Sequence, residues 1–175
     1  QPFFLNLAHW TVHTPLQASK ADYDALSSIP DHRRRVYMAM VKSIDRSVGR
    51  VLQTLKEEGL DDNTIVIFAS DNGAPNYIGL PDVNSPYRGW KLTMFEGGLR
   101  VPYMAKWPGH IAPGTQYKAP ITNIDILPTV VAAAGGTLPQ ERPIDGVNLL
   151  PYRGAKPAAQ PARVPFWPDG PYRAT

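Results

Sequence analysis

Three short apolar runs along the chain have the hydrophobic pattern of β-strands. Residues 3–8 (Phe-Phe-Leu-Asn-Leu-Ala) and 64–69 (Thr-Ile-Val-Ile-Phe-Ala) are almost continuously apolar, which predicts strands that are buried in a sheet. Residues 101–107 predict another strand, because the Pro108-Gly109 turn follows them directly. Buried strands of this kind are typical of sheets that are covered on both faces.

Two longer stretches have the spacing of helices. Residues 33–58 place apolar side chains on one helical face: Tyr37, Met40, Val41, Ile44, Val48, Val51, Leu52 and Leu55. Asp31 is positioned to cap the start of this helix, and Gly59 can supply a left-handed residue at its end. A second helix is predicted over residues 125–134, where Asp125 caps the start and a Gly-Gly pair follows the end.

The order of these elements predicts an α/β fold. Strands that alternate with helices imply a mainly parallel sheet with helices on both of its faces. A hydrophobic content of 43% and a charged content of 19% fit a globular protein rather than a disordered one. Pro, Ala and Arg dominate the chain after residue 151, so we expect an extended, poorly packed tail over residues 152–175.

Charge and cysteine content narrow the function classes. The net charge of +3 is small, and the basic residues cluster at 33–35, where a solvated helix start explains them better than a nucleic-acid contact. No apolar run approaches the roughly 20 residues that cross a bilayer. We therefore expect neither a nucleic-acid nor a membrane partner. The chain has no cysteine, which excludes disulfides and thiolate metal sites.

Polar residues with oxygen ligands follow the apolar run at 64–69 without a break. Asp71 and Asn72 lie in the segment Ser-Asp-Asn-Gly at 70–73, where an α/β sheet presents its active-site residues. Calcium accepts carboxylate and amide oxygens together, so the two side chains are candidate calcium ligands. The alternative is an Asx turn, in which the same residues only reverse the chain.

A cation and two histidines are the other candidates for chemistry. Lys91 precedes the Glu-Gly-Gly segment at 96–98 and could neutralise an anionic substrate, although a lone lysine is usually a surface residue. His13 follows the first apolar run and could bind or protonate a substrate oxygen, or only pack against its neighbours. His9 is a weaker candidate for the wall of the same site.

In combination, the motifs of this chain resemble those of the sulfatase family, within the alkaline-phosphatase-like superfamily. The resemblance runs from Gln1 to about Pro151. The matching segments, in the family's order, are residues 3–5, 13–15, 70–73, 88–91, 95–102, 107–109, 125–129 and 145–147. Each segment by itself is weak evidence for the family, and the set is specific because all of its members occur in the family's order.

This resemblance implies a function and a role for each candidate. Sulfatases hydrolyse sulfate esters with calcium and a formylglycine, so a sulfated small molecule or glycan is the expected substrate. Asp71 and Asn72 match calcium ligands, whereas Lys91 and His13 match residues that contact the sulfate and act in catalysis. His9 would lie at the substrate pocket. A periplasmic or secreted location is favoured by the resemblance alone.

The nucleophile motif of the family has no match in this chain. Formylglycine forms from Cys or Ser in a Cys/Ser-x-Pro-x-Arg motif, and at Ser28 the arginine, Arg33, falls one position late. We therefore expect residues 1–151 to be an incomplete catalytic domain, with a partial calcium site and with its nucleophile in the missing remainder of the protein. By itself the chain should be inactive, and it should either self-associate or depend on that remainder.

Two alternatives stay open at this stage. A phosphonate or phosphate monoester hydrolase of the same superfamily could share the Asp-Asn-Gly turn and the lysine. A non-catalytic remnant that binds calcium or a sugar is the other alternative. The residue at the nucleophile position would distinguish the enzymes from one another.

Overall fold

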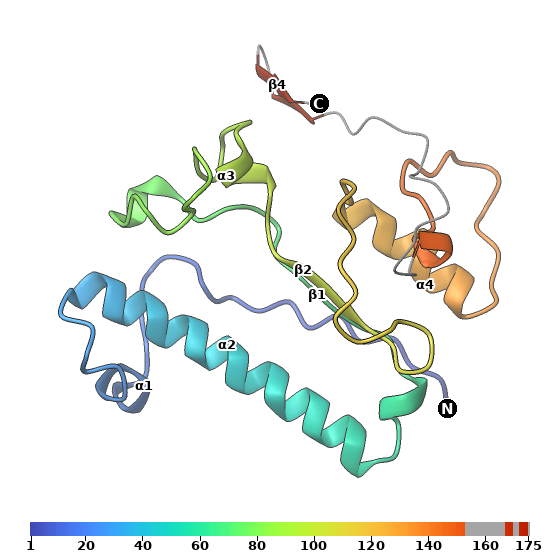
Figure 1. The fold of residues 1–175 in the computed structure, drawn as a ribbon, viewed down its shortest axis with the longest axis horizontal. Helices are drawn as coiled ribbons and strands as arrows, with labels where there is room; N and C mark the ends of the chain where they lie inside the picture. Colours follow the sequence, from blue (N-terminus) through green and yellow to red (C-terminus); the bar gives the residue numbers. More distant parts are fainter. Residues whose placement is uncertain (153–166, 170–171, 175) are drawn as a thin grey trace. The chain divides into compact units, whose positions relative to one another are not determined.

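The chain divides into two compact units, which are described separately below. The structure, a computed structural model, describes residues 1–152, 167–169 and 172–174 (Figure 1). Unit 1 consists of Gln1–Asp61 and Pro75–Val83. Unit 2 consists of Asp62–Ala74 and Asn84–Thr175.

Unit 1 is built around the long helix α2, His32–Glu57, which follows the short helix α1, Lys20–Asp24. Asp31 caps α2, because its carboxylate accepts a hydrogen bond of 2.6 Å from the Arg34 N–H. Ser19 caps α1 in the same way by accepting from the Asp22 N–H. The predicted helix over residues 33–58 is confirmed, with a shift of one residue at each end.

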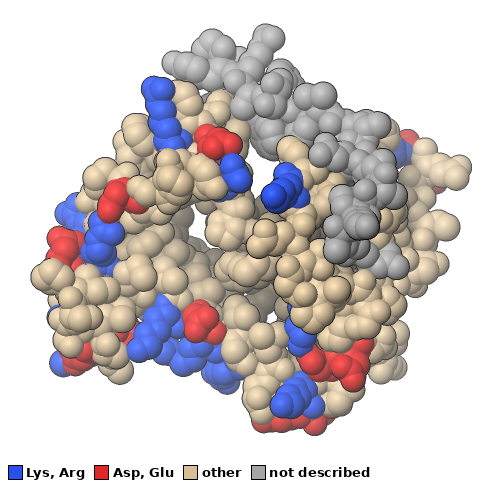
Figure 2. All heavy atoms as spheres, in the orientation of Figure 1, with Lys and Arg blue, Asp and Glu red and all other residues tan. Residues whose placement is uncertain are grey.

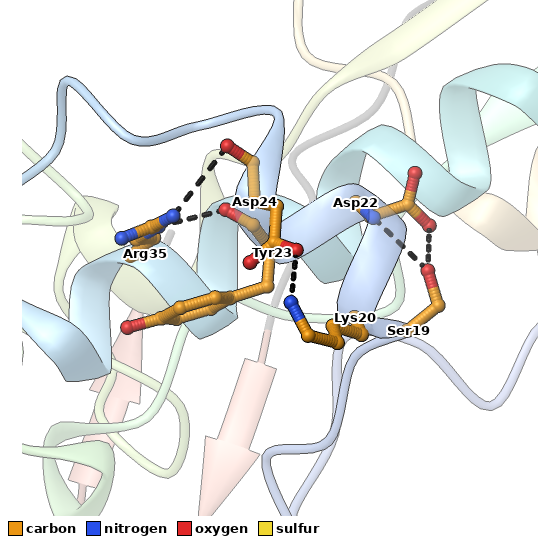
Figure 3. A network of polar contacts seen from close by, with 6 residues as sticks. All are labelled: Ser19, Lys20, Asp22, Tyr23, Asp24 and Arg35. Atoms are coloured by element: carbon orange, nitrogen blue, oxygen red, sulfur yellow. Dashed lines mark hydrogen bonds and ion pairs between the residues drawn. The ribbon is translucent and has the colours of Figure 1, made fainter.

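Polar side chains fix α1 on α2. Asp22 is buried and accepts hydrogen bonds from both terminal nitrogens of Arg46, at 2.6 and 2.9 Å. These hydrogen bonds, together with one from the Ser19 hydroxyl, lower the pKa of Asp22 from 3.8 to about 2. Figure 3 shows the other end of α1, where the Arg35 guanidinium lies over the Tyr23 ring and donates to the Tyr23 carbonyl.

The arginines at 33–35 make contacts within unit 1. Arg33 donates to the Ile78 carbonyl at 3.3 Å, and Arg34 pairs with Asp82 at 2.5 Å. Ile78 belongs to the 3₁₀ turn η2, Asn76–Ile78, and is only 4% exposed. On the face in Figure 2, the Lys and Arg side chains of the described residues lie among Asp and Glu side chains. Arg33 and Arg34 therefore secure segment 75–83 to α2, whereas Arg35 contacts α1.

The first apolar run does not form the predicted buried strand. Residues 3–8 have no regular secondary structure, and the side chains of Phe3, Phe4 and Leu7 are 57%, 76% and 50% exposed. A strand needs a neighbour for its backbone hydrogen bonds, and no described strand pairs with this segment. Phe3 instead lines a groove of about 520 Å³ whose wall includes α2 residues such as Val51 and Leu55.

Unit 2 contains a pair of strands at the other two apolar runs. β1, Val66–Ala69, pairs with β2, Tyr103–Lys106, so the predicted strands at 64–69 and 101–107 are confirmed in position. The pairing is antiparallel, with Val66 opposite Lys106. A hydrogen bond from the Ser70 N–H to the Pro102 carbonyl continues the pairing beyond β1.

The predicted mainly parallel sheet with helices on both faces is not found among the described residues. Apart from β1 and β2, the structure describes one strand pair, β3 (Trp167–Asp169) with β4 (Tyr172–Ala174), which is also antiparallel. The prediction inferred direction from the alternation of strands and helices. Hydrophobic runs establish that a strand exists, whereas its direction depends on the strand beside it.

A buried aspartate organises the remaining helix of unit 2. Helix α4, Ile126–Ala133, follows the 3₁₀ turn η3, Asn123–Asp125, and confirms the predicted helix over 125–134 to within one residue at each end. The predicted cap is wrong, because the Asp125 side chain makes no capping hydrogen bond to α4 and belongs instead to a capping box of η3 with Thr122. The side chain of Asp125 is fully buried, and its two oxygens accept from the Thr122 and Val147 N–H groups. This contact ties segment 145–147 to the start of α4.

The remaining regular elements are short. They are the helix α3, Glu96–Leu99, and the 3₁₀ turns η1, Asp61–Asn63, and η4, Leu150–Tyr152. Most of the predicted tail at 152–175 lies outside the described residues. Among the helices that the structure describes, none has the length and apolar character needed to cross a membrane.

Candidate active site

Asp71 and Asn72 lie side by side at the end of β1. The Asn72 side-chain nitrogen donates to one oxygen of the Asp71 carboxylate at 2.6 Å, and the Asn72 side-chain oxygen and the other Asp71 oxygen are further acceptors of the pair. Asp71 is exposed and Asn72 is half-buried. The Ser70 hydroxyl donates to the Asn72 carbonyl, and the Asn123 amide donates to the Ser70 carbonyl, so the turn is supported on two sides.

The backbone of this turn packs directly on helix α3. The Gly73 N–H donates to the Gly98 carbonyl at 3.0 Å. A Cβ atom at Gly73 would overlap the Gly97 carbonyl oxygen, so the approach requires a residue without a side chain. The Gly-Gly pair at 97–98, which the sequence places after Lys91, is therefore a contact surface for the aspartate-asparagine turn.

Lys91 is attached to the same turn through its backbone. The Lys91 N–H donates to the Ala74 carbonyl at 3.3 Å, and the Gly97 N–H donates to the Arg88 carbonyl at 2.7 Å. A Cβ at Gly97 would lie 2.7 Å from the Arg88 carbonyl oxygen and would overlap that of Gly89. The segments 70–74, 88–91 and 96–98 thus interlock, and Lys91 is a half-buried residue.

The two candidate histidines belong to unit 1. His13 is exposed, and its Nδ1 atom lies 3.0 Å from the carbonyl of Thr14, which is a hydrogen bond when Nδ1 carries the proton. His9 is also exposed, as is Trp10, which has 91% of its surface accessible. These residues belong to or directly follow the segment for which a buried strand was predicted.

The charged residues on either side of the Gly97-Gly98 pair are exposed. Arg100 pairs with Glu96 at 3.3 Å across one turn, and both side chains are more than 60% accessible to solvent. Arg100 also lies over the Tyr87 ring, and Arg88 lies over the Phe95 ring. This exposure excludes a buried ion pair between Glu96 and Arg100.

Asn84 is a residue of this site that the sequence did not single out. Its side-chain oxygen accepts from the Ala74 N–H at 2.9 Å, and its amide nitrogen donates to the Ala74 carbonyl at 2.8 Å and the Gly89 carbonyl at 3.1 Å. The contact with Ala74 spans ten positions inside a long loop. No periodic pattern predicts such a pairing, because it depends on how the loop folds back on itself.

The donor atoms at the turn fit part of a calcium shell. Calcium takes about six to eight oxygen ligands, of which Asp71 and Asn72 would supply a carboxylate and an amide oxygen. Among the described residues, no group of three or more His, Cys, Asp or Glu side chains could hold a metal ion. The chemistry of the two donors therefore suits calcium, and their number alone would give weak binding.

Comparison with known proteins identifies the family of this chain. A family model described as sulfatase matches residues 1–136. The chain belongs to the sulfatase family. It is 39% identical to the steryl-sulfatase of Rattus norvegicus and 40% identical to the N-acetylgalactosamine-6-sulfatase of Homo sapiens, in each case over 86% of its length. The chain covers 26% and 28% of these two sulfatases, or about a quarter of their length.

Solved structures of sulfatases share the fold. The chain resembles Ps i-CgsB with a TM-score of 0.81 and 38% identity, over 86% of this chain and 33% of that one. The PsFucS1 sulfatase from Pseudoalteromonas sp. gives a TM-score of 0.68 and 33% identity, over 82% of this chain and 28% of that one. These likenesses assign the alkaline-phosphatase-like fold of the sulfatases, and they confirm the resemblance seen in the motifs.

Proposed function

We propose that this sulfatase chain carries part of the active site of a sulfate ester hydrolase. The observation that supports the proposal most directly is the interlock of the turn at 70–74 with the Lys91 segment. It brings the backbones of Asp71, Asn72 and Lys91, the residues that carry a carboxylate, an amide and an ammonium group, into one loop cluster. A site for a sulfate ester needs these groups, because sulfate oxygens are anionic and further negative charge develops on the leaving oxygen.

Each candidate residue has a proposed role. Asp71 and Asn72 would hold calcium, which supplies positive charge to the sulfate oxygens when it is bound. Lys91 would bind a sulfate oxygen and stabilise the charge of the leaving oxygen. His13 would hydrogen-bond the ester oxygen and give it a proton, with His9 at the pocket wall. The nucleophile, a formylglycine, would come from outside residues 1–175.

A sulfated glycan is the substrate class that we propose. One similar solved structure is Ps i-CgsB in complex with k-i-k-neocarrahexaose, at a TM-score of 0.76 and 36% identity. Another similar structure was solved in complex with its substrate D-glucosamine-2-N,6-O-disulfate. Trp90, beside Lys91, is exposed and offers flat apolar surface of the kind that contacts sugar rings.

The proposal is tested by sulfatase assays on the full-length protein that contains residues 1–175. With nitrophenyl sulfate as substrate, Lys91→Ala should lower kcat/KM roughly 100-fold, as the loss of one group that stabilises the transition state does. Asp71→Ala should also lower kcat/KM, and an excess of calcium should partly restore it. Lys106→Ala is the matched control, because that lysine lies on β2 outside the interlocked segments.

Parallel assays separate the alternatives. Faster turnover of nitrophenyl phosphate or of a phosphonate ester than of the sulfate would replace the proposal by the phosphomonoesterase or phosphonate hydrolase alternative. Calcium or sugar binding without turnover of any of these esters would favour a non-catalytic remnant. If Lys91→Ala and Lys106→Ala had equal activity, the proposed role of Lys91 would be wrong.

A further inference from the structure

We propose that Asn84 is a positioning residue that holds Lys91 against the turn bearing Asp71 and Asn72. This inference rests on the proposed function, because it concerns the geometry of the same site. It assigns a role to a side chain that touches neither the proposed metal ligands nor the lysine ammonium through any contact described above. Its effect would pass entirely through the backbone.

The hydrogen bonds of Asn84 use every donor and one acceptor position of its amide. The oxygen accepts from the Ala74 N–H at 2.9 Å, and the nitrogen donates to the Ala74 and Gly89 carbonyls at 2.8 and 3.1 Å. Asn84 therefore pairs with both backbone groups of Ala74, as a neighbouring strand would. The same side chain holds Gly89 in place with its second N–H.

The two partners of Asn84 are close in sequence to the proposed site residues. Ala74 follows Asn72 by two positions, and Gly89 precedes Lys91 by two positions. The Ala74 carbonyl accepts from the Lys91 N–H as well as from the Asn84 amide. A single carbonyl group thus joins the turn, the asparagine and the lysine backbone, and the asparagine fixes its orientation.

The residue type follows from the number and kind of bonds. An aspartate at position 84 could still accept from the Ala74 N–H, but its negative oxygens would face the Ala74 and Gly89 carbonyls without a donor. An alanine would remove the three hydrogen bonds that the Asn84 side chain makes to the backbone of the half-buried residues Ala74 and Gly89. Only an amide of this length offers an acceptor and two donors at the same place.

A fixed separation between the lysine and the metal turn matters for the proposed chemistry. Charged groups stabilise a transition state most when they are already oriented, so that no reorganisation is needed during the reaction. Loosening the Lys91 segment should therefore lower kcat more than it raises KM. If Asn84 had a purely structural role, its substitution would lower the stability of the protein, and the kcat and KM of the molecules that remain folded would not change.

The first test measures amide hydrogen exchange in the full-length protein that contains residues 1–175, and it needs no activity. In Asn84→Ala the Lys91 amide should exchange about tenfold faster, because the carbonyl that accepts its proton loses its support. Asn84→Asp should also raise the exchange rate, because its carboxylate oxygen would face the Ala74 and Gly89 carbonyls without a donor. Asn123→Ala is the matched control: it removes an amide bond to the same turn, at Ser70, without touching the Lys91 segment. Unchanged exchange at Lys91 in both Asn84 variants would overturn the inference.

The second test is a double-mutant cycle in the full-length protein, with nitrophenyl sulfate as substrate. Asn84→Ala should lower kcat about tenfold, and it should have almost no further effect when Lys91 is already alanine. An undiminished effect in the Lys91→Ala background would refute the inference while leaving the proposed function intact. If the Lys91→Ala variant instead kept the activity of the wild type, the proposed function would be contradicted. If Asn84→Ala fails to fold, Asn84→Asp takes its place in both tests.

Discussion

The two units of the chain are held by different kinds of contact. In unit 1, charged and aromatic side chains join the elements, as in the pair of Asp22 with Arg46 and the stacking of Arg35 on Tyr23. In unit 2, backbone meets backbone at Gly73 and Gly97, with little room for a side chain. Long side chains adjust to small shifts, whereas a backbone contact does not. Unit 2 should therefore be the less tolerant of substitution, at the place where the proposed site lies.

The largest expected effect is on the glycine contact of unit 2. Gly73→Ala should lower the free energy of unfolding by about 3 kcal/mol, because the new methyl group would overlap the Gly97 carbonyl and one of the two backbone segments would have to shift. Urea denaturation followed by near-ultraviolet circular dichroism measures the change. Gly136→Ala is the control, since its nearest atoms lie 3.3 and 3.4 Å away on Val131. Equal losses in the two variants would show that the close approach is not rigid.

The second effect is electrostatic and concerns unit 1. Arg46→Met should destabilise the chain, and the difference from the wild type should depend on pH. The pKa of Asp22 is about 2 in the folded chain against an ordinary 3.8, so its pairing stabilises the fold fully above pH 3.8. This stabilisation should decrease as the pH falls from 3.8 to about 2, and be absent below that.

Denaturation curves between pH 2 and pH 7 test this dependence. Arg50→Met is the matched control, because Arg50 lies one turn further along α2 and makes no hydrogen bond with Asp22. Its difference from the wild type should be the same at every pH. Parallel pH curves for Arg46→Met and the wild type would mean that the ion pair contributes nothing to stability.

The smallest effect is a gain in stability within the scaffold of unit 1. Gly49 lies inside α2 with no atom within 4 Å of an added Cβ, so Gly49→Ala should raise the free energy of unfolding by about 0.5–1 kcal/mol. Gly59, just after the helix, is equally uncrowded but has a φ of +65°. Gly59→Ala should therefore destabilise the chain by about 1 kcal/mol. Thermal unfolding checks both variants, whose midpoint temperatures should shift in opposite directions from that of the wild type.

Much of the candidate site was predictable from local sequence. The run at 64–69 indicated a strand, and the polar residues after it pointed to a turn that presents Asp71 and Asn72. The position of Lys91 before a Gly-Gly pair made it a candidate residue, and the structure adds that the backbone of its segment contacts this turn. Asn84 was not predictable, because its partners lie five and ten residues away in irregular structure.

The amino-acid sequence by itself determined the positions of α2, α4, β1 and β2, and the membership of the sulfatase family. Those features depend on side-chain spacing and caps within one segment, and the ordered motifs are local as well. Tertiary structure alone decided that β1 and β2 run antiparallel, that residues 3–8 stay exposed, and that Glu96 and Arg100 pair in solvent. Strand direction and burial depend on which other segment lies alongside, and the spacing of residues within one segment contains no information about its neighbour.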